Sequence, residues 1–185
     1  MKVKGTVITD LVKIVRKEKH LNWGDYLMPE DWEVINDDIM ASAWYPGELF
    51  YRLSYAVFKV VGGSELEICT TFGKFTAHNV AQTYKNLIVP GDPAASMERF
   101  IERRKSFFSG DYASSELGEV KSGQGWLRFL YTNAEPSVKG EEVASVIAHS
   151  VAGVLQELAS MTGAEDVSSG LSDKGGFFEI NIRWK

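Results

Sequence analysis

The spacing of apolar residues changes from helical to alternating after about residue 110, and this change constrains the fold more than any other feature. Up to about residue 110 the apolar residues recur every three or four positions, which is typical of amphipathic helices. Beyond it, the segments 112–132 and 165–184 alternate between apolar and polar residues, which indicates two β-hairpins. A helical pattern from Gly140 to Met161 separates them. This order predicts an α+β fold in which N-terminal helices pack on a four-stranded antiparallel sheet.

The chain of 185 residues is long enough for one domain with a single core. No internal repeat, low-complexity tract or long polar linker divides the sequence. We therefore expect a single domain over 1–185, with a mainly helical part at 1–110 and a ββαββ part at 111–185.

One helix of the first part has apolar residues around most of its circumference. Ser64 and Glu67 form a capping-box pattern, so this helix is expected to begin near Glu65. It has two apolar stripes at helical spacing, one through Leu66, Cys69, Gly73, Ala77, Val80, Tyr84 and Leu87, the other through Ile68, Phe72 and Phe75. The pattern predicts that this is the central, most buried helix. The next helix is expected to begin with Asp92 as its N-cap and Pro93 in its first turn.

Charge and cysteine content exclude several classes of partner. With 20 Lys and Arg against 25 Asp and Glu, the net charge is -5, which does not suit nucleic acid. The single cysteine, Cys69, forms no internal disulfide and no multi-thiolate zinc site, which favours a reducing compartment, so we expect a cytoplasmic protein. The sequence lacks a run of about 18 apolar residues and a secretory signal pattern, so we expect no membrane span.

The motifs of catalysis and metal binding are missing from the sequence. No G-x-S-x-G occurs, and Cys69 lies among apolar residues in the middle of a helix. His20, His78 and His149 belong to three separate elements, and no H-x-x-x-H or C-x-x-C pair is present. The sequence therefore predicts no catalytic residue, no cofactor-binding residue and no metal ligand, and we expect that the protein is not an enzyme.

Aromatic residues and one polar residue suggest a ligand pocket. The chain contains 10 Phe, 7 Tyr and 5 Trp, and large rings can leave an apolar cavity between helices and sheet, although they can also fill the core. His78 lies in an otherwise apolar helix and needs a polar partner, which is either a ligand or a backbone or water group. The candidate pocket residues are Cys69, Phe72, Phe75, His78, Phe100 and Tyr131.

The segment 116–135, the helix from Gly140 and the terminal strand 177–182 together resemble the C-terminal half of the H-NOX-like superfamily. This superfamily includes haem-based nitric-oxide sensors, small-ligand domains of the 4-vinyl reductase type and the TRAPP subunits of vesicle tethering. The chain looks most like an uncharacterised bacterial family of about this length, through Trp32, Trp44-Tyr45-Pro46 and Phe72-Gly73-Lys74-Phe75. The resemblance implies an H-NOX-like or TRAPP-like fold.

The sequence departs from the haem-binding members of this superfamily. Those members carry a Tyr-x-Ser-x-Arg motif for the haem propionates, and here only Tyr131 matches, with Glu135 at the place of the arginine. A glutamate would repel a propionate. The resemblance also puts the proximal histidine between Asp92 and Gly110, where the chain has none. TRAPP relatives have an acyl-binding cavity and dimerise through helices. We therefore expect this fold without haem or another cofactor.

Two main hypotheses of function follow, and an enzyme is a third option, which a cleft holding a strongly perturbed carboxylate or histidine would favour. The first is a non-enzymatic sensory or ligand-binding domain that binds an apolar or planar small molecule, or a protein partner, in signalling. The alternative is a structural interaction module that forms a homodimer through its early helices and has a solid interior. An enclosed cavity of roughly a few hundred Å³ beside Phe72, Phe75, His78 and Phe100 favours the first hypothesis over the second.

Overall fold

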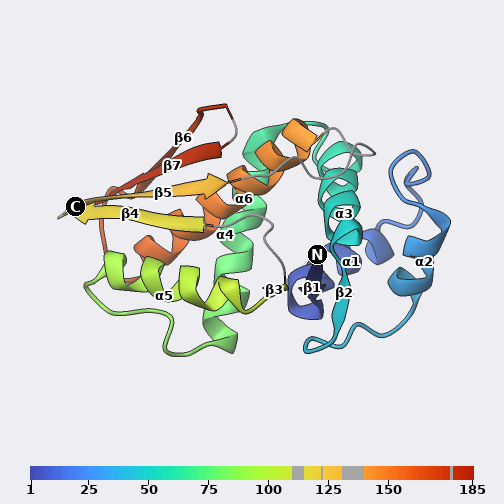
Figure 1. Ribbon diagram of the computed structural model, residues 1–185, viewed down its shortest axis with the longest axis horizontal. Helices are drawn as coiled ribbons and strands as arrows, with labels where there is room; N and C mark the ends of the chain where they lie inside the picture. The colour runs from blue at the N-terminus through green and yellow to red at the C-terminus, as the bar shows by residue number, and fades with distance from the viewer. Residues whose placement is uncertain (110–114, 122, 131–139, 176) are drawn as a thin grey trace.

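The computed structural model describes residues 1–109, 115–121, 123–130, 140–175 and 177–185. Its helices are α1 (Gly5–Lys17), α2 (Pro29–Asn36), α3 (Gly47–Val60), α4 (Leu66–Thr83), α5 (Pro93–Lys105) and α6 (Gly140–Met161). Its strands are β1 (Lys2–Lys4), β2 (Trp44–Pro46), β3 (Phe108–Ser109), β4 (Ser115–Lys121), β5 (Gln124–Leu130), β6 (Ser168–Asp173) and β7 (Phe177–Arg183). The α+β class is confirmed. Figure 1 shows β4 to β7 at one end of the molecule and α2 at the other.

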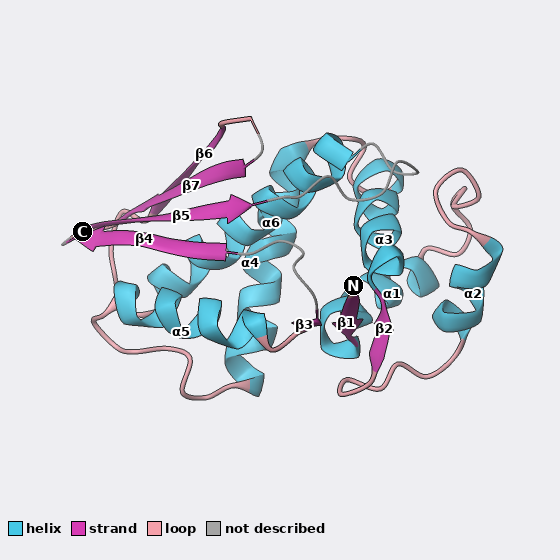
Figure 2. Cartoon of the chain, viewed as in Figure 1, coloured by secondary structure: helices cyan, strands magenta, loops and turns pink. Residues whose placement is uncertain are grey.

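The larger sheet is antiparallel and has the strand order β4-β5-β7-β6. In β5, Leu127 is paired with Leu117 of β4 on one side and with Ile180 of β7 on the other. Phe178, Ile180 and Ile182 of β7 are buried, and the residues between them are less so. This alternation gives the sheet one apolar face, which packs on helices (Figure 2).

A second, three-stranded sheet has the order β2-β1-β3, again with antiparallel pairs. Val3 in the central strand is fully buried and lies opposite Tyr45 of β2 and Phe108 of β3. The sequence pattern does not predict this sheet, because its strands have two or three residues each, too few to show an alternation. The sheet places the beginning of the chain next to the segment that follows α5.

The helices that cover the larger sheet differ from those expected. α6 packs on β6 and β7, and α5 packs on β4. Helices α1, α2 and α3 pack mainly with one another, and α3 also contacts α6 (Figure 1). The expectation that the N-terminal helices pack on the sheet is therefore wrong for α1 to α3. The reason is that α6 is apolar on several sides, so it contacts the sheet on one side and other helices elsewhere.

The expectation that the helix from Glu65 is the most buried one is also wrong. On α4 only Cys69, Gly73 and Ala77 are buried, and Ile68 and Phe75 are 44% and 58% exposed. The central helix is α6, whose buried residues are Val143, Ala144, Val146, Ile147, Ala148, Val151, Ala152, Val154, Leu155, Leu158 and Ala159.

One of the two predicted helix caps is present. The Asp92 carboxylate accepts a hydrogen bond from the backbone N–H of Ala95, at 2.9 Å, and caps α5 as expected. The capping box at the start of α4 is not formed. Ser64 has a φ of 68°, in the left-handed region, and Glu65 takes the N-cap position without a side-chain hydrogen bond.

Helix α6 is long and apolar enough to cross a membrane by length and composition, over Glu142–Met161. Within the fold, 67% of this stretch is buried, and α6 contacts α3, α4, α5 and the sheet. This is the position of a core helix, which passes the same test of length and apolarity as a membrane span. The absence of a membrane span stays a prediction.

Candidate ligand-binding site

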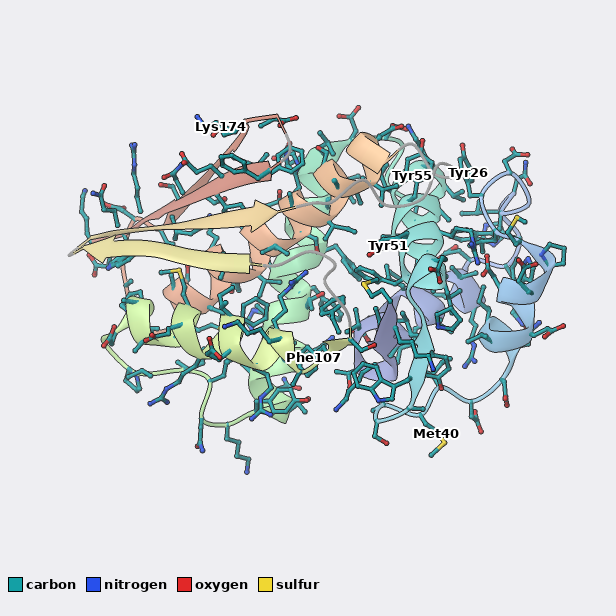
Figure 3. All side chains as sticks on the ribbon, viewed as in Figure 1. Tyr26, Met40, Tyr51, Tyr55, Phe107 and Lys174 are labelled. Atoms are coloured by element: carbon teal, nitrogen blue, oxygen red, sulfur yellow. The ribbon has the colours of Figure 1, made fainter. Side chains whose placement is uncertain are left out.

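A cavity of about 220 Å³ lies between α1, α3, α4, α5 and α6. Its wall is mostly apolar. The apolar side chains that the helices contribute are Val7, Leu11 and Ile14 of α1; Phe50, Val57 and Phe58 of α3; Ile68, Phe72 and Val80 of α4; Phe100 of α5; and Val146, Ile147, Val151 and Val154 of α6. Val61, which follows α3 and is 43% exposed, also lines the cavity. Phe107 and Phe108, which follow α5, also line the cavity, and Figure 3 shows Phe107 between α5 and α1.

The two faces of α4 explain why a cavity forms here. Gly73 lies so close to α6 that a Cβ atom on it would come within 2.0 Å of the Ser150 carbonyl oxygen. A Cβ atom on Gly153 of α6 would likewise come within 2.0 Å of the Thr70 carbonyl oxygen of α4. The contact between α4 and α6 is therefore made through small residues. The larger side chain of Phe72, on another side of α4, lines the cavity.

The structure brings together three of the six candidate pocket residues. Cys69, Phe72 and Phe100 line the cavity. Phe75 and His78 do not; Phe75 lines a neighbouring groove, and the His78 side chain is 53% exposed. His78 Nε2 lies 3.0 Å from the Glu157 carboxylate, so the polar partner expected for this histidine is a carboxylate of α6. Tyr131 lies outside the described residues.

A polar groove between α1 and α4 adjoins the cavity. The two hollows share Thr6, Asp10, Ile14, Phe72, Thr76 and Val80. At the groove, Asn79 of α4 donates a hydrogen bond to the Asp10 carboxylate of α1, at 2.8 Å, and Lys13 pairs with the same carboxylate at 3.1 Å. The groove therefore brings polar side chains of α1 and α4 next to the cavity.

Cys69 is a neutral group in the cavity wall. Its side chain is buried, and burial raises the pKa of the Cys69 thiol to about 11. A cysteine acts as a nucleophile or a metal ligand as the thiolate, which is a minor form at neutral pH when the pKa is this high. A neutral, buried thiol has the properties of a packing residue, and that Cys69 is not catalytic stays a prediction.

Arg104 is a cavity-lining residue that the sequence prediction of the pocket did not include. It lines the cavity from the last turn of α5, is 8% exposed, and has its guanidinium carbon 4.6 Å from the centre of the Phe108 ring. The sequence contains a signal for this position, because Arg104 falls on the apolar face of α5, four residues after Phe100. A charged residue on an apolar stripe is the pattern that identifies it.

The α3 wall of the cavity is held to the start of α6 by a polar cluster. Tyr55 donates a hydrogen bond to the Glu142 carboxylate at 2.7 Å, and Lys59 pairs with the same carboxylate. Burial and this hydrogen bond raise the pKa of Tyr55. The Tyr55 ring also meets Tyr26 edge to face, with centroids 5.8 Å apart (Figure 3). These contacts fix one side of the cavity.

Comparison with known proteins gives a structural match and no sequence match. No family model and no curated protein matches the chain. The fold is similar to the Fe(II) unliganded H-NOX protein from K. algicida, with 12% identity, a TM-score of 0.65, and coverage of 98% of this chain and 96% of that one. It is also similar to an oxygen-binding H-NOX domain related to soluble guanylate cyclases, with 13% identity, a TM-score of 0.60, and coverage of 98% and 95%. The chain has the H-NOX fold. At these identities the likeness concerns the fold alone.

The H-NOX fold implies haem, and the residues around this cavity do not fit it. Haem iron is held by His, Cys, Met or Tyr. Among the described residues that line the cavity, Cys69 alone is of these types, and its thiol is neutral. His149 Nδ1 lies 2.8 Å from the Ser145 carbonyl oxygen, outside the cavity wall, and the side chains of His20 and His78 are 73% and 53% exposed. The described part of the chain also holds no group of three His, Cys, Asp or Glu suited to a metal ion.

Proposed function

We propose that this protein is a non-enzymatic sensory domain of the H-NOX fold that binds an apolar small molecule in the cavity between α1, α3, α4, α5 and α6. The observation that carries the proposal is the cavity itself, of about 220 Å³ with mostly apolar walls. An apolar cavity of about 150 Å³ is already large enough to take up benzene. The H-NOX fold, which is that of ligand-binding sensors, supports the same conclusion.

The energetics of packing favour a ligand over a permanent void. Protein interiors are packed nearly as closely as organic crystals. Apolar side chains that face an unfilled space lose packing contacts on that side. A ligand that fills the space recovers contacts that the wall otherwise lacks.

An interaction module is the second candidate function. Three exposed large apolar residues lie before α3: Met28 (48% exposed), Met40 (65%) and Trp44 (45%). Such residues suit contact with a second protein. The cavity argues against the solid interior that this alternative requires, but a partner that binds at the early helices is compatible with a ligand in the cavity. The mass of the native protein in solution tests whether it forms a dimer.

Cavity-filling variants test the first function. Val57 of α3 and Val80 of α4 line the cavity, whereas Val60 of α3 is not among the lining residues. We expect octanol to raise the melting temperature of the wild type and of Val60→Phe, and to bind Val57→Phe and Val80→Phe at least about tenfold more weakly, because the added ring occupies the same space. Calorimetric titration measures the affinities. Equal octanol binding by all four proteins would show that the ligand does not occupy this cavity.

A further inference from the structure

Ser54 is the only polar residue that α3, which the structure describes in full, contributes to the wall of the cavity. Phe50, Val57 and Phe58 line the cavity from the same face of α3, four residues before Ser54 and three and four residues after it. Ser54 is 8% exposed. A buried hydroxyl group costs free energy unless it forms a hydrogen bond, so its place in an apolar stripe requires an explanation.

The Ser54 hydroxyl forms no hydrogen bond with the described residues. Other helical hydroxyls donate to the carbonyl oxygen one turn earlier, as Thr76 does to Phe72 at 3.0 Å and Ser160 to Gln156 at 3.1 Å. No completely buried side-chain oxygen in the described part of the chain lacks a partner. The Ser54 oxygen therefore keeps some accessible surface, and at this position on α3 that surface faces the cavity.

The other polar residues of the cavity wall differ from Ser54. Thr6 donates a hydrogen bond to the Ala41 carbonyl oxygen at 3.0 Å, and the Asp10 carboxylate accepts one from Asn79 at 2.8 Å. Arg104 also interacts with other groups of the protein. Ser150 of α6 is only half-buried, which makes its hydroxyl a weaker candidate for a ligand contact. Among the described lining residues, Ser54 thus combines deep burial with a free hydroxyl.

We infer that the ligand of this cavity has an apolar body with one oxygen, as in an alcohol or a ketone, and that this oxygen accepts a hydrogen bond from the Ser54 hydroxyl. This inference rests on the proposed function and names the ligand class. A buried water typically needs about three polar partners. The α3 face offers a single hydroxyl among aromatic and aliphatic side chains, so a ligand oxygen held in place by its own apolar body fits this position better than a water molecule.

The experiment compares two probes of similar shape, benzyl alcohol and ethylbenzene, which differ by a hydroxyl group in place of a methyl group. We expect Ser54→Ala to bind benzyl alcohol at least about fivefold more weakly than the wild type does, because the probe oxygen loses its partner. The affinity for ethylbenzene should change by less than about twofold, since it makes no hydrogen bond. Ser160→Ala, which removes an exposed hydroxyl outside the cavity wall, should bind both probes as the wild type does. Calorimetric titration of each protein with each probe gives the affinities.

Each result decides between the two proposals. If the wild type binds only ethylbenzene, or if Ser54→Ala keeps its affinity for benzyl alcohol or loses affinity for both probes alike, the inference about the ligand oxygen is wrong and the apolar cavity stands. If neither probe binds the wild type, the proposed function fails and the inference fails with it. The melting temperature without a probe is a second check: Ser54→Ala should melt no lower than the wild type, because alanine favours a helix and the hydroxyl has no partner among the described residues. A lower melting temperature would show that the hydroxyl stabilises the fold, which overturns its assignment to a ligand.

Discussion

At the scale of single residues, burial decides which chemistry the cavity wall offers. Burial raises the pKa of the Cys69 thiol to about 11, so this group is neutral at physiological pH. Arg104 keeps its charge when buried, because a guanidinium does not deprotonate in proteins. The wall thus combines an unreactive thiol with a permanent cation.

The reactivity of Cys69 tests this view. We expect iodoacetamide at pH 8 to modify Cys69 in the folded protein at least about a hundredfold more slowly than free cysteine, because the thiolate is scarce and the side chain is buried. Mass spectrometry over time measures the rate, and unfolding in guanidinium chloride should restore it. Modification as fast as that of free cysteine in the folded protein would contradict the burial of the thiol.

The same pKa predicts how stability depends on pH. The Cys69 pKa is higher in the folded protein than in the unfolded chain, so the unfolded chain loses the proton first as the pH rises. Stability should therefore fall between about pH 9 and 11, by roughly 3 kcal/mol from this group. Urea unfolding at several pH values, with Cys69→Ala as the control, measures this contribution. A wild-type profile parallel to that of the variant would contradict it.

Single residues also show what the sequence can and cannot predict. The cap at Asp92 was predictable because it depends on residues adjacent in the chain. The capping box at Ser64 was not formed, because the turn before α4 puts this residue in the left-handed region. Cys69, Phe72 and Phe100 were predicted for the pocket from their stripes alone. The spacing of apolar residues does not show whether an apolar helix face packs against the core or lines a cavity, so it did not identify Arg104 as a lining residue.

At the scale of elements, the contact between α4 and α6 determines where the cavity lies. Gly73 and Gly153 allow the two backbones to approach closely, and the larger residues of α4 are left on its other sides. The bounds of α6, Gly140 to Met161, agree with the sequence prediction because the helical period runs through this whole stretch. The prediction for the burial of α4 is wrong, because two apolar stripes indicate two contact faces but do not show which elements cover them.

Glycine substitutions test the close contact. We expect Gly153→Ala to lower the free energy of unfolding by at least about 2 kcal/mol, because the new Cβ would lie 2.0 Å from the Thr70 carbonyl oxygen. A decrease in the free energy of unfolding is informative, because in an isolated helix the change from glycine to alanine is stabilising by about 1 kcal/mol. Gly170→Ala is the control, because nothing lies within 4 Å of its added Cβ. Denaturant unfolding measures both, and a Gly153→Ala variant as stable as the wild type would rule out this packing.

At the scale of the whole molecule, the fold by itself does not determine which ligand is bound. The chain matches H-NOX structures over 98% of its length, with TM-scores of 0.60 and 0.65 for the two compared above. The order of helical and alternating spacings of apolar residues along the sequence was enough to predict the α+β class and the hairpins. It was not enough to predict the three-stranded sheet, whose short strands come from distant parts of the chain. The arrangement of α1 to α3 away from the larger sheet also depends on these distant contacts.

The last prediction at this scale is that this protein of H-NOX fold does not hold haem. On titration with haemin, we expect no stoichiometric Soret band that survives gel filtration, because the described cavity wall lacks histidine, tyrosine and methionine and its one thiol is neutral. Absorbance before and after gel filtration measures this. A retained band that disappears in Cys69→Ala would show that this thiol ligates iron despite its burial. A retained band that persists in Cys69→Ala would mean that another residue supplies the ligand, and the cavity would then have to be interpreted as a haem site.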